Sequence, residues 1–219
     1  MITLTEENYI KAIYHLGKQG VELVNTNAIA EAMQTKASSV TDMIKKLSEK
    51  DYAVYKKYQG VNLTEKGQSV AINIIRRHRL WEVFLVEKLN FTWDQVHEVA
   101  EDLEHIRSEK LIDELDAFLE YPNYDPHGDP IPNKEGVFKY VEKVLLSQAI
   151  EGKTYTCIGV KDTSTTFLKY LDSNGIGLGT IIEILYKEPY DNSIKLRLES
   201  KPIVVSHNVA KNLFLQESN

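Results

Sequence analysis

Hydrophobic side chains recur at helical spacing along the first 50 residues of the chain. Thr5 is expected to cap a first helix, which carries acidic residues in its first turn and ends at Gly17. A short helix is predicted over 28–33, and a third helix opens at residues 38–41. The buried face of this third helix is expected to consist of Val40, Met43, Ile44 and Leu47.

Apolar and polar side chains then alternate, as expected for two short strands. The segments 52–58 and 61–64 are joined by Gln59-Gly60 and predict a β-hairpin, and a further helix is predicted over 68–88. Helix, short helix, turn, helix and hairpin in this order predict a winged helix-turn-helix, a fold that binds DNA. The alternative is a small helical bundle whose lysines are simply solvated.

The third predicted helix has the side chains that a recognition helix needs. Its first turn is small and polar, so it would enter the major groove and hydrogen-bond to base edges. Lysines beside it and in the hairpin would contact phosphates. The predicted DNA-binding residues are Lys36, Ser38, Ser39, Thr41, Asp42, Lys45, Lys56 and Lys57.

The rest of the chain divides into a helical region and a strand-rich region. Amphipathic helices are interrupted by four prolines between Pro122 and Pro132, and a short helix is predicted over 134–146. Short strands in the last third suggest a small barrel. These strands are predicted over 155–160, 180–185, 193–198 and 202–206, with a helix near 209–215. The expected fold is mostly α with small β, in domains 1–75, 76–150 and 151–219.

The composition is that of a globular chain of 219 residues. Its apolar fraction of 42 % and charged fraction of 26 % argue against disordered and fibrous classes. No apolar run approaches the roughly 18 residues of a membrane helix, and the N-terminus has no secretory pattern. The single cysteine, Cys157, is expected to be buried and inert, which fits a reducing compartment. A cytoplasmic protein without membrane contact is therefore predicted.

Charge is distributed unevenly along the chain. Residues 1–79 carry 12 Lys/Arg against 8 Asp/Glu, a net charge of +4, whereas residues 80–120 carry 3 against 12, a net charge of −9. The formal net charge of −6 does not exclude DNA binding, because phosphate contact requires only local positive charge. The acidic segment needs an explanation of its own.

The acidic segment brings imidazoles and carboxylates together. At 100° per residue, offsets of one, three and four place four such side chains on one arc of a helix. These residues are His97, Glu101, Glu104 and His105, and His78 with Glu82 forms a second pair at i, i+4. Carboxylates and imidazoles without thiolate suit Mn²⁺ or Fe²⁺ and would accept Zn²⁺ or Co²⁺. The alternative is a solvated acidic face with incidental histidines.

Asp125 and His127 lie in the proline-bounded turn and would supply further ligands from a loop. A metal held by His and Glu can also activate water for hydrolysis. The chain, however, has no His-Glu-x-x-His motif, no Gly-x-Ser-x-Gly elbow and no phosphate-binding Gly-Lys loop. A protein that is not an enzyme is predicted, and a metal-binding hydrolase or a metal buffer stays the alternative.

A series of motifs follows a fixed order along nearly the whole chain. They are Glu7-Asn-Tyr-Ile-Lys-Ala-Ile-Tyr14, Ser38-Ser-Val-Thr41, Leu63-Thr-Glu-Lys-Gly67, Arg77-His-Arg-Leu80, Glu82, Val96-His97, Glu101-x-x-Glu-His105 and Pro126-His-Gly-Asp-Pro-Ile-Pro132. In this order they resemble the metal-dependent transcriptional regulators of the diphtheria toxin repressor type, especially their manganese-responsive branch. The resemblance implies an N-terminal winged-helix domain, a helical dimerisation domain with two metal sites, and a C-terminal SH3-like domain.

The resemblance also implies which residues hold the metal ions. One site would be formed by His78, Glu82 and His97, with Asp162 of the third domain as a candidate further ligand. The second would be formed by Glu101, Glu104 and His105, near Asn8 of the first helix. Asp125 and His127 match a loop from which some members supply Cys and His.

Three positions depart from the family pattern. Glu101 stands where iron-responsive members often carry cysteine, and Asp125 replaces the loop cysteine, so both offer oxygen ligands that suit a harder ion. Asn8 stands where manganese-type members usually carry aspartate, so one negative charge is missing. The sequence predicts a homodimeric, Mn²⁺- or Fe²⁺-dependent DNA-binding repressor that controls metal-ion homeostasis. Its expected partners are a pseudo-palindromic double-stranded operator and a second copy of the chain, with no small-molecule substrate.

Overall fold

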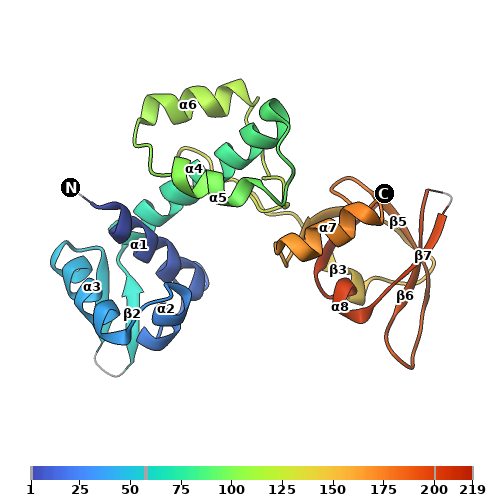
Figure 1. The fold of residues 1–219 in the computed structure, drawn as a ribbon, viewed down its shortest axis with the longest axis horizontal. Coiled ribbons are helices and arrows are strands. Elements are labelled where there is room, and N and C mark those ends of the chain that lie inside the picture. Colours follow the sequence, from blue (N-terminus) through green and yellow to red (C-terminus); the bar gives the residue numbers. More distant parts are fainter. Residues whose placement is uncertain (1, 57–58, 200, 219) are drawn as a thin grey trace. The chain divides into compact units, whose positions relative to one another are not determined.

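The computed structural model describes residues 2–56, 59–199 and 201–218 of the chain (Figure 1). Helices dominate, and the strands form one two-stranded and one six-stranded sheet, in agreement with the predicted fold class. Backbone contacts divide the chain into two compact units. The first unit combines residues 1–78, 102–112 and 132–137, and the second combines 79–101, 113–131 and 138–219.

The first unit begins with the predicted winged helix-turn-helix. The third helix buries Val40, Ile44 and Leu47 as predicted, whereas Met43 is only half-buried. The hairpin pairs Ala53 with Leu63 and Lys56 with Gly60. The elements are α1 (Leu4–Leu16), α2 (Thr26–Ala32), α3 (Ala37–Glu49), β1 (Ala53–Lys56) and β2 (Gly60–Leu63).

The N-cap of α1 is Thr3, so the prediction of Thr5 was wrong. The Thr3 hydroxyl accepts a hydrogen bond from the Glu6 N–H at 3.2 Å, and the Glu6 carboxylate accepts one from the Thr3 N–H at 2.8 Å. This reciprocal capping box satisfies two backbone N–H groups at once. Thr5 is followed three residues later by Asn8, which does not complete such a box.

Three helices follow the hairpin: α4 (Glu65–Leu89), α5 (Val96–Leu103) and α6 (Glu109–Phe118). The helix predicted over 134–146 is not formed. Instead the Asn133 side chain accepts a hydrogen bond from the Val137 N–H at 2.8 Å, and Gly136 adopts a left-handed conformation with φ of +79°. This turn closes before a helix can start, and the chain then continues to β3 (Val144–Leu145).

The C-terminal part of the second unit is a six-stranded antiparallel sheet in the order β3-β8-β4-β5-β6-β7. Phe167, Leu168 and Leu171 of a helix that the sequence analysis did not predict lie in its core. The strands are β4 (Thr154–Val160), β5 (Ile181–Lys187), β6 (Ile194–Leu198), β7 (Lys201–Val205) and β8 (Leu213–Glu217), with η1 (Leu146–Gln148), α7 (Thr165–Ser173) and α8 (His207–Ala210) between them.

The prediction of a helix near 209–215 was also partly wrong. Only α8 is helical there, and Leu213–Glu217 is a strand that lies between β3 and β4. Leu213 and Leu215 are fully buried while Phe214 is half-buried, a period of two that both flanking strands enforce through hydrogen bonds.

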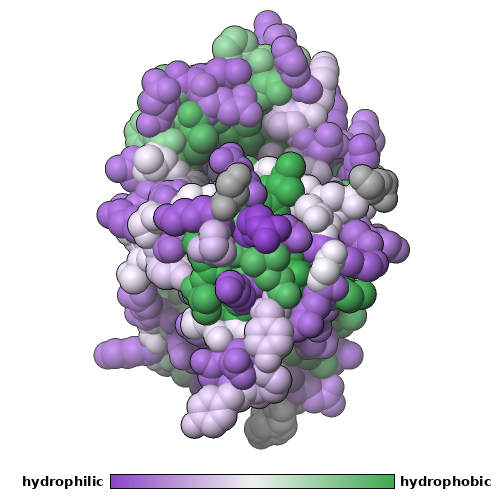
Figure 2. Space-filling view, turned by 90° about the vertical axis from the view of Figure 1, so that its right-hand side faces the viewer, coloured by the Kyte–Doolittle hydropathy of each residue, from purple (hydrophilic) through white to green (hydrophobic). Residues whose placement is uncertain are grey.

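Hydrophobic and hydrophilic side chains are interspersed on the surface that Figure 2 shows. In β6, burial alternates strictly, so Lys195 and Arg197 face outward while Ile194, Leu196 and Leu198 face the core. Cys157 is buried in β4 as predicted, and burial raises the pKa of its thiol to about 11. Among the described residues, no helix is both long and apolar enough to cross a bilayer.

Candidate metal centre

Three buried side chains of the second unit converge on one point. Glu82 of α4, Asp125 and His127 each offer a ligand atom, and these atoms lie within 4.8 Å of one another. All three residues are at most 5 % exposed. Two carboxylates and one imidazole in so small a buried volume form a donor set that a divalent cation would neutralise.

The loop that carries Asp125 and His127 is folded by its own hydrogen bonds. Asp125 Oδ1 accepts from the His127 N–H at 2.8 Å and from the Asp129 N–H at 3.0 Å. Gly128 has a φ of +85°, a conformation that favours glycine. The His127 carbonyl accepts from the Val160 N–H at 2.9 Å, which fixes the loop to β4.

The main chain orients the His127 ring. Its Nε2 lies 2.8 Å from the carbonyl oxygen of Trp93, so this nitrogen carries the proton and donates it. Its Nδ1 faces Glu82 Oε2 at 3.7 Å. The ring also stacks on the indole of Trp93, with an interplanar angle of 8°. In the neutral ring, Nδ1 therefore presents a lone pair to the cluster.

The charges in this cluster shift the pKa values of its members. Burial, with the nearby carboxylates Glu82 and Asp129, raises the pKa of Asp125 to about 7. Burial alone would lower the pKa of His127, but the hydrogen bond and the charge of Glu82 raise it to about 8. Arg79 partly compensates the negative charge, since its guanidinium lies 3.3 Å from Asp125 and 3.3 Å from Asp129.

Glu82 also has histidine neighbours from the first predicted ligand set. His97 Nδ1 of α5 lies 3.6 Å from Glu82 Oε1, and the His97 side chain is 62 % exposed. His78 precedes Glu82 by one turn of the continuous helix α4, so both side chains share one face of that helix. Asp162 does not join the cluster of Glu82, Asp125 and His127; its carboxylate accepts from the Ser164 N–H at 2.9 Å ahead of α7.

The single arc predicted for the second ligand set is not formed. Helix α5 ends at Leu103, so Glu104 and His105 lie in the turn that follows it. Glu101 is on the helix, half-exposed, and its carboxylate lies 3.8 Å from His97 Nε2. The Ile106 N–H donates to the Leu103 carbonyl at 3.1 Å, which turns the chain away from the helix axis.

Glu104 and His105 face helix α1 in the first unit. The Glu104 carboxylate accepts hydrogen bonds from Lys11 and from His78 Nδ1, the latter at 2.7 Å. Burial raises the pKa of Glu104, but the His78 hydrogen bond and the Lys11 charge outweigh it and hold this pKa below its ordinary value. His105 Nδ1 lies 2.7 Å from Glu7, and His105 Nε2 lies 4.0 Å from Glu104.

Asn8 supplies an independent observation on this second set. Its side-chain oxygen Oδ1 is buried and has no hydrogen-bond partner among the described residues. Asn8 lies on α1 between Glu7 and Lys11, whose side chains contact His105 and Glu104. An acceptor of this kind fits a cation, because buried polar atoms otherwise carry a free-energy cost.

Sequence reasoning missed Glu7, Lys11 and Trp93. Glu7 was interpreted only as an acid in the first turn of a helix, but it is buried and also contacts Arg107 at 3.2 Å and Arg77 at 3.5 Å. The Lys11–Glu104 pair joins positions 93 apart in sequence. No local spacing signals such contacts, although two acidic residues within an otherwise apolar helix face are a weak sign of burial.

The predicted DNA-binding residues that the structure describes lie at the N-cap of α3, along α3 as far as Lys45, and in β1. The side chains that are exposed are Lys36, Ser38, Ser39, Asp42, Lys45 and Lys56. Thr41 is half-buried, and its hydroxyl donates to the Ala37 carbonyl at 3.0 Å. Lys45 Nζ lies 3.3 Å from Asp42. Lys57, also predicted to contact DNA, lies outside the described residues.

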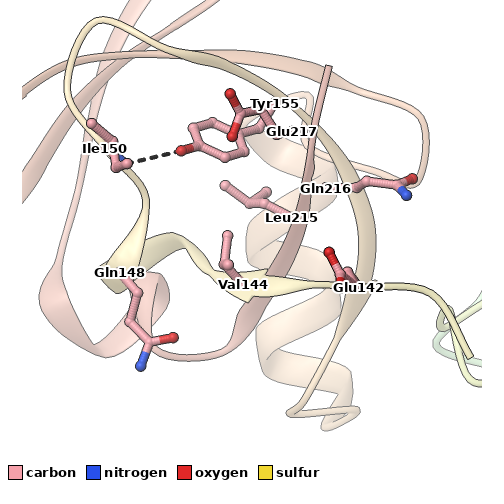
Figure 3. A pocket seen from close by; sticks show the side chains of 8 residues that line it. All are labelled: Glu142, Val144, Gln148, Ile150, Tyr155, Leu215, Gln216 and Glu217. Atoms are coloured by element: carbon pink, nitrogen blue, oxygen red, sulfur yellow. Dashed lines mark hydrogen bonds between the residues drawn. The ribbon is translucent and has the colours of Figure 1, made fainter. Parts of the chain in front are cut away.

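A separate cavity of about 360 Å³ lies beside β3, β4 and β8 (Figure 3). Tyr155 and Leu215 are buried in its wall, whereas Glu142 and Gln216 line it with polar groups. The Tyr155 hydroxyl accepts a hydrogen bond from the Ile150 N–H at 3.0 Å. None of the predicted metal ligands lines this cavity, so it is distinct from the metal centre.

Sequence profiles of known families match successive parts of the chain. Residues 1–61 match the N-terminal DNA-binding domain of iron-dependent repressors, and residues 64–133 match their metal-binding and dimerisation domain. The chain belongs to the iron-dependent repressor family. Residues 144–217 match the FeoA domain. The predicted family and its function, metal-dependent repression of transcription by a DNA-binding homodimer, are thereby confirmed.

Individual members of the iron-dependent repressor family align with a little more than half of the chain. The identity is 36 % over 122 residues to the HTH-type transcriptional regulator MntR of Geobacillus kaustophilus, which covers 55 % of this chain and 84 % of that protein. It is 33 % over 128 residues to the iron-dependent repressor IdeR of Mycobacterium bovis, which covers 58 % of this chain. That alignment spans 55 % of IdeR, about half its length.

Solved structures of the repressor family match nearly the whole chain. A manganese-dependent transcriptional repressor in complex with manganese superposes with a TM-score of 0.83 at 31 % identity, covering 97 % of this chain and 100 % of that chain. The manganese regulator SloR superposes with a TM-score of 0.73 at 32 % identity, covering 99 % and 100 %. The repressor fold therefore extends through the C-terminal sheet.

Proposed function

We propose that this chain is a manganese-activated repressor whose ion is held by Glu82, Asp125 and His127. The observation that carries the proposal is the convergence of these three buried groups within 4.8 Å. Two carboxylates with no ion between them repel each other, and a divalent cation relieves that repulsion. His97 and His78 flank Glu82 and would supply further nitrogen ligands.

The donor types favour manganese over softer ions. The cluster offers carboxylate oxygens and imidazole nitrogen, and the chain's single thiol lies buried in β4. Hard oxygen ligands suit Mn²⁺, while Fe²⁺, Zn²⁺ and Co²⁺ would also bind imidazole and carboxylate. A complete absence of thiolate ligands therefore makes Mn²⁺ our choice for the physiological ion.

Contacts within the first unit suggest how ion binding would reach DNA. Helix α1 is linked through Glu7 to His105, two residues after the end of α5, the helix that carries His97 and Glu101. It is linked through Glu6 to Lys50 at the end of the recognition helix α3, with Nζ–O distances of 2.7 and 2.9 Å. We infer that α1 transmits the state of the ligand residues to α3, whose spacing in a homodimer sets the fit to two operator half-sites.

The test is DNA affinity measured with Mn²⁺ and with chelator at fixed salt. A duplex selected from a random pool in the presence of Mn²⁺ serves as operator, and binding is followed by fluorescence anisotropy. We expect roughly 5–150-fold tighter binding with Mn²⁺, the range of ordinary allosteric coupling. Glu82→Gln should abolish the difference, whereas Glu98→Gln, an exposed position of α5, should retain it. Equal DNA affinity in Mn²⁺ and chelator would favour a metal buffer or hydrolase.

A further inference from the structure

The ammonium group of Lys11 contacts both carboxylate oxygens of Glu104. Its Nζ lies 2.7 Å from Oε1 and 2.8 Å from Oε2. The Glu104 side chain is fully buried, and that of Lys11 is 15 % exposed. Because His78 also contacts Oε2, three of the carboxylate's roughly four acceptor positions are occupied.

The ammonium group lies where a cation is expected. Glu104, His105 and Asn8 were predicted as ligands of a second ion, and the Asn8 Oδ1 atom is buried without a partner among the described residues. Lys11 follows Asn8 by three residues on α1. Lys11 therefore lies on the same face of α1 as Asn8, and it places its positive charge at the carboxylate of Glu104.

We propose that Lys11 is a built-in competitor for the second divalent ion, so that Glu104, His105 and Asn8 bind an ion only when the ammonium group is displaced. The chain would then load its two sites in a fixed order. Glu82, Asp125 and His127 bind at low ion concentration, and the second site binds only at a higher one. This inference rests on the proposed function in taking Mn²⁺ as the ion and Glu82, Asp125 and His127 as the first site.

The order in which the two sites bind ions follows from the groups that the incoming ion must displace at each site. Beside Glu82, Asp125 and His127, the Arg79 guanidinium lies 3.3 Å from one oxygen of Asp125. At Glu104 the ion must displace an ammonium group that contacts both carboxylate oxygens, at 2.7 and 2.8 Å, in a bidentate ion pair shielded from water. Lys11 also keeps α1 attached to Glu104 when no second ion is present.

The test counts Mn²⁺ ions bound to the full-length chain, by the EPR signal of free Mn²⁺ and by calorimetry. Wild type should show one tight and one weak step, and Lys11→Met should tighten the weak step at least tenfold. Lys11→Arg keeps the charge and should bind like wild type. Lys153→Met is the control, because Lys153 forms an ion pair with Glu217 and neither residue is a predicted metal ligand. An unchanged weak step in Lys11→Met would overturn the proposal.

A second measurement uses the wild-type chain and does not depend on a variant that folds. Amine-reactive labelling followed by mass spectrometry reports how accessible Lys11 is. At the Mn²⁺ concentration that fills the second site, we expect labelling of Lys11 to rise at least fivefold. Full loading with Lys11 still protected would refute the competition.

Failure of the proposed function gives a different result. If Glu82→Gln left the tight step intact, the ion would not be held at Glu82, Asp125 and His127. The effect of Lys11→Met on the weak step, measured in the Glu82→Gln background, would still decide whether Lys11 competes.

Discussion

The tautomer of His127 is set by the backbone before any ion binds. Nε2 donates to the Trp93 carbonyl, so only Nδ1 is available to the cluster. In metal sites a ligand histidine commonly uses its second nitrogen in this way, which fixes the ring and raises its basicity. A cation bound as proposed would therefore meet a preorganised nitrogen, and protons would compete with it for the same atom.

Mn²⁺ affinity should consequently depend on pH. In the metal-free chain the pKa of Asp125 is raised to about 7 and that of His127 to about 8. Both groups must lose their protons to bind the ion. Affinity should be constant above pH 8, fall about tenfold per pH unit between 8 and 7, and fall more steeply below 7. Calorimetry at pH 6.5, 7.5 and 8.5, in buffers of different ionisation enthalpy, measures the affinity and counts the released protons.

His207→Gln is the control for this experiment. His207 is an exposed residue at the start of α8, outside the ligand cluster, so its removal should leave the pH profile unchanged. Equal Mn²⁺ affinity at pH 6.5 and 8.5, without proton release, would show that Asp125 and His127 do not bind the ion.

At the scale of single residues, the sequence predicted neighbours along one helix, but it did not predict contacts between distant segments. The four-residue offset of His97 and Glu101 correctly placed them side by side, because that offset is a property of the helix itself. The contacts of Glu104 with Lys11 and of His127 with Trp93 join distant segments, and only tertiary folding brings them together. Whether these residues ligate metal stays a prediction.

At the scale of elements, the loop 125–129 depends on close packing against β4. A Cβ at Gly128 would lie 2.0 Å from the Ile158 carbonyl oxygen and 2.4 Å from Gly159 Cα. These are backbone atoms, which have little room to move. The strand has a register shift between Cys157 and Gly159, and this irregularity accommodates the loop.

Gly128→Ala should therefore destabilise the chain and weaken Mn²⁺ binding. The left-handed backbone alone costs alanine about 1–2 kcal/mol, and overpacking adds about 1–3 kcal/mol. Gly175→Ala isolates the first contribution, because Gly175 has a φ of +71° and open space around it. Urea unfolding should show the larger loss for Gly128→Ala, together with at least tenfold weaker Mn²⁺ binding. Equal losses for the two variants would mean that the loop is not packed as described.

Local signals predicted most elements, and the errors have local causes. The hairpin and four strands were correctly located because alternation and turn residues mark them. Residues 213–217 and 134–146 contain apolar side chains at spacings compatible with either type of element. Pairing with the neighbouring strand makes residues 213–217 a strand, and the turn at Asn133 prevents a helix over 134–146.

For the whole molecule, charge asymmetry links the ion site to DNA. The winged-helix region is mildly basic, whereas residues 80–120 carry a net charge of −9. If the buried cluster holds Mn²⁺ as proposed, each bound ion would add two positive charges per chain, which would also favour approach to DNA.

The salt dependence of operator binding should count the phosphate contacts of both chains. Each phosphate neutralised contributes about 0.9 to the slope of log affinity against log salt, so one lysine lost from each protomer should reduce the slope by about 1.8. Lys36→Gln and Lys45→Gln remove exposed charges, one at the N-cap of α3 and one within α3, and should show this change in the presence of Mn²⁺. Lys195→Gln removes an exposed charge from β6 and should leave the slope unaltered. If neither α3 variant changes the slope, α3 does not approach the phosphate backbone as a recognition helix would, and the DNA-binding residues predicted there are wrong.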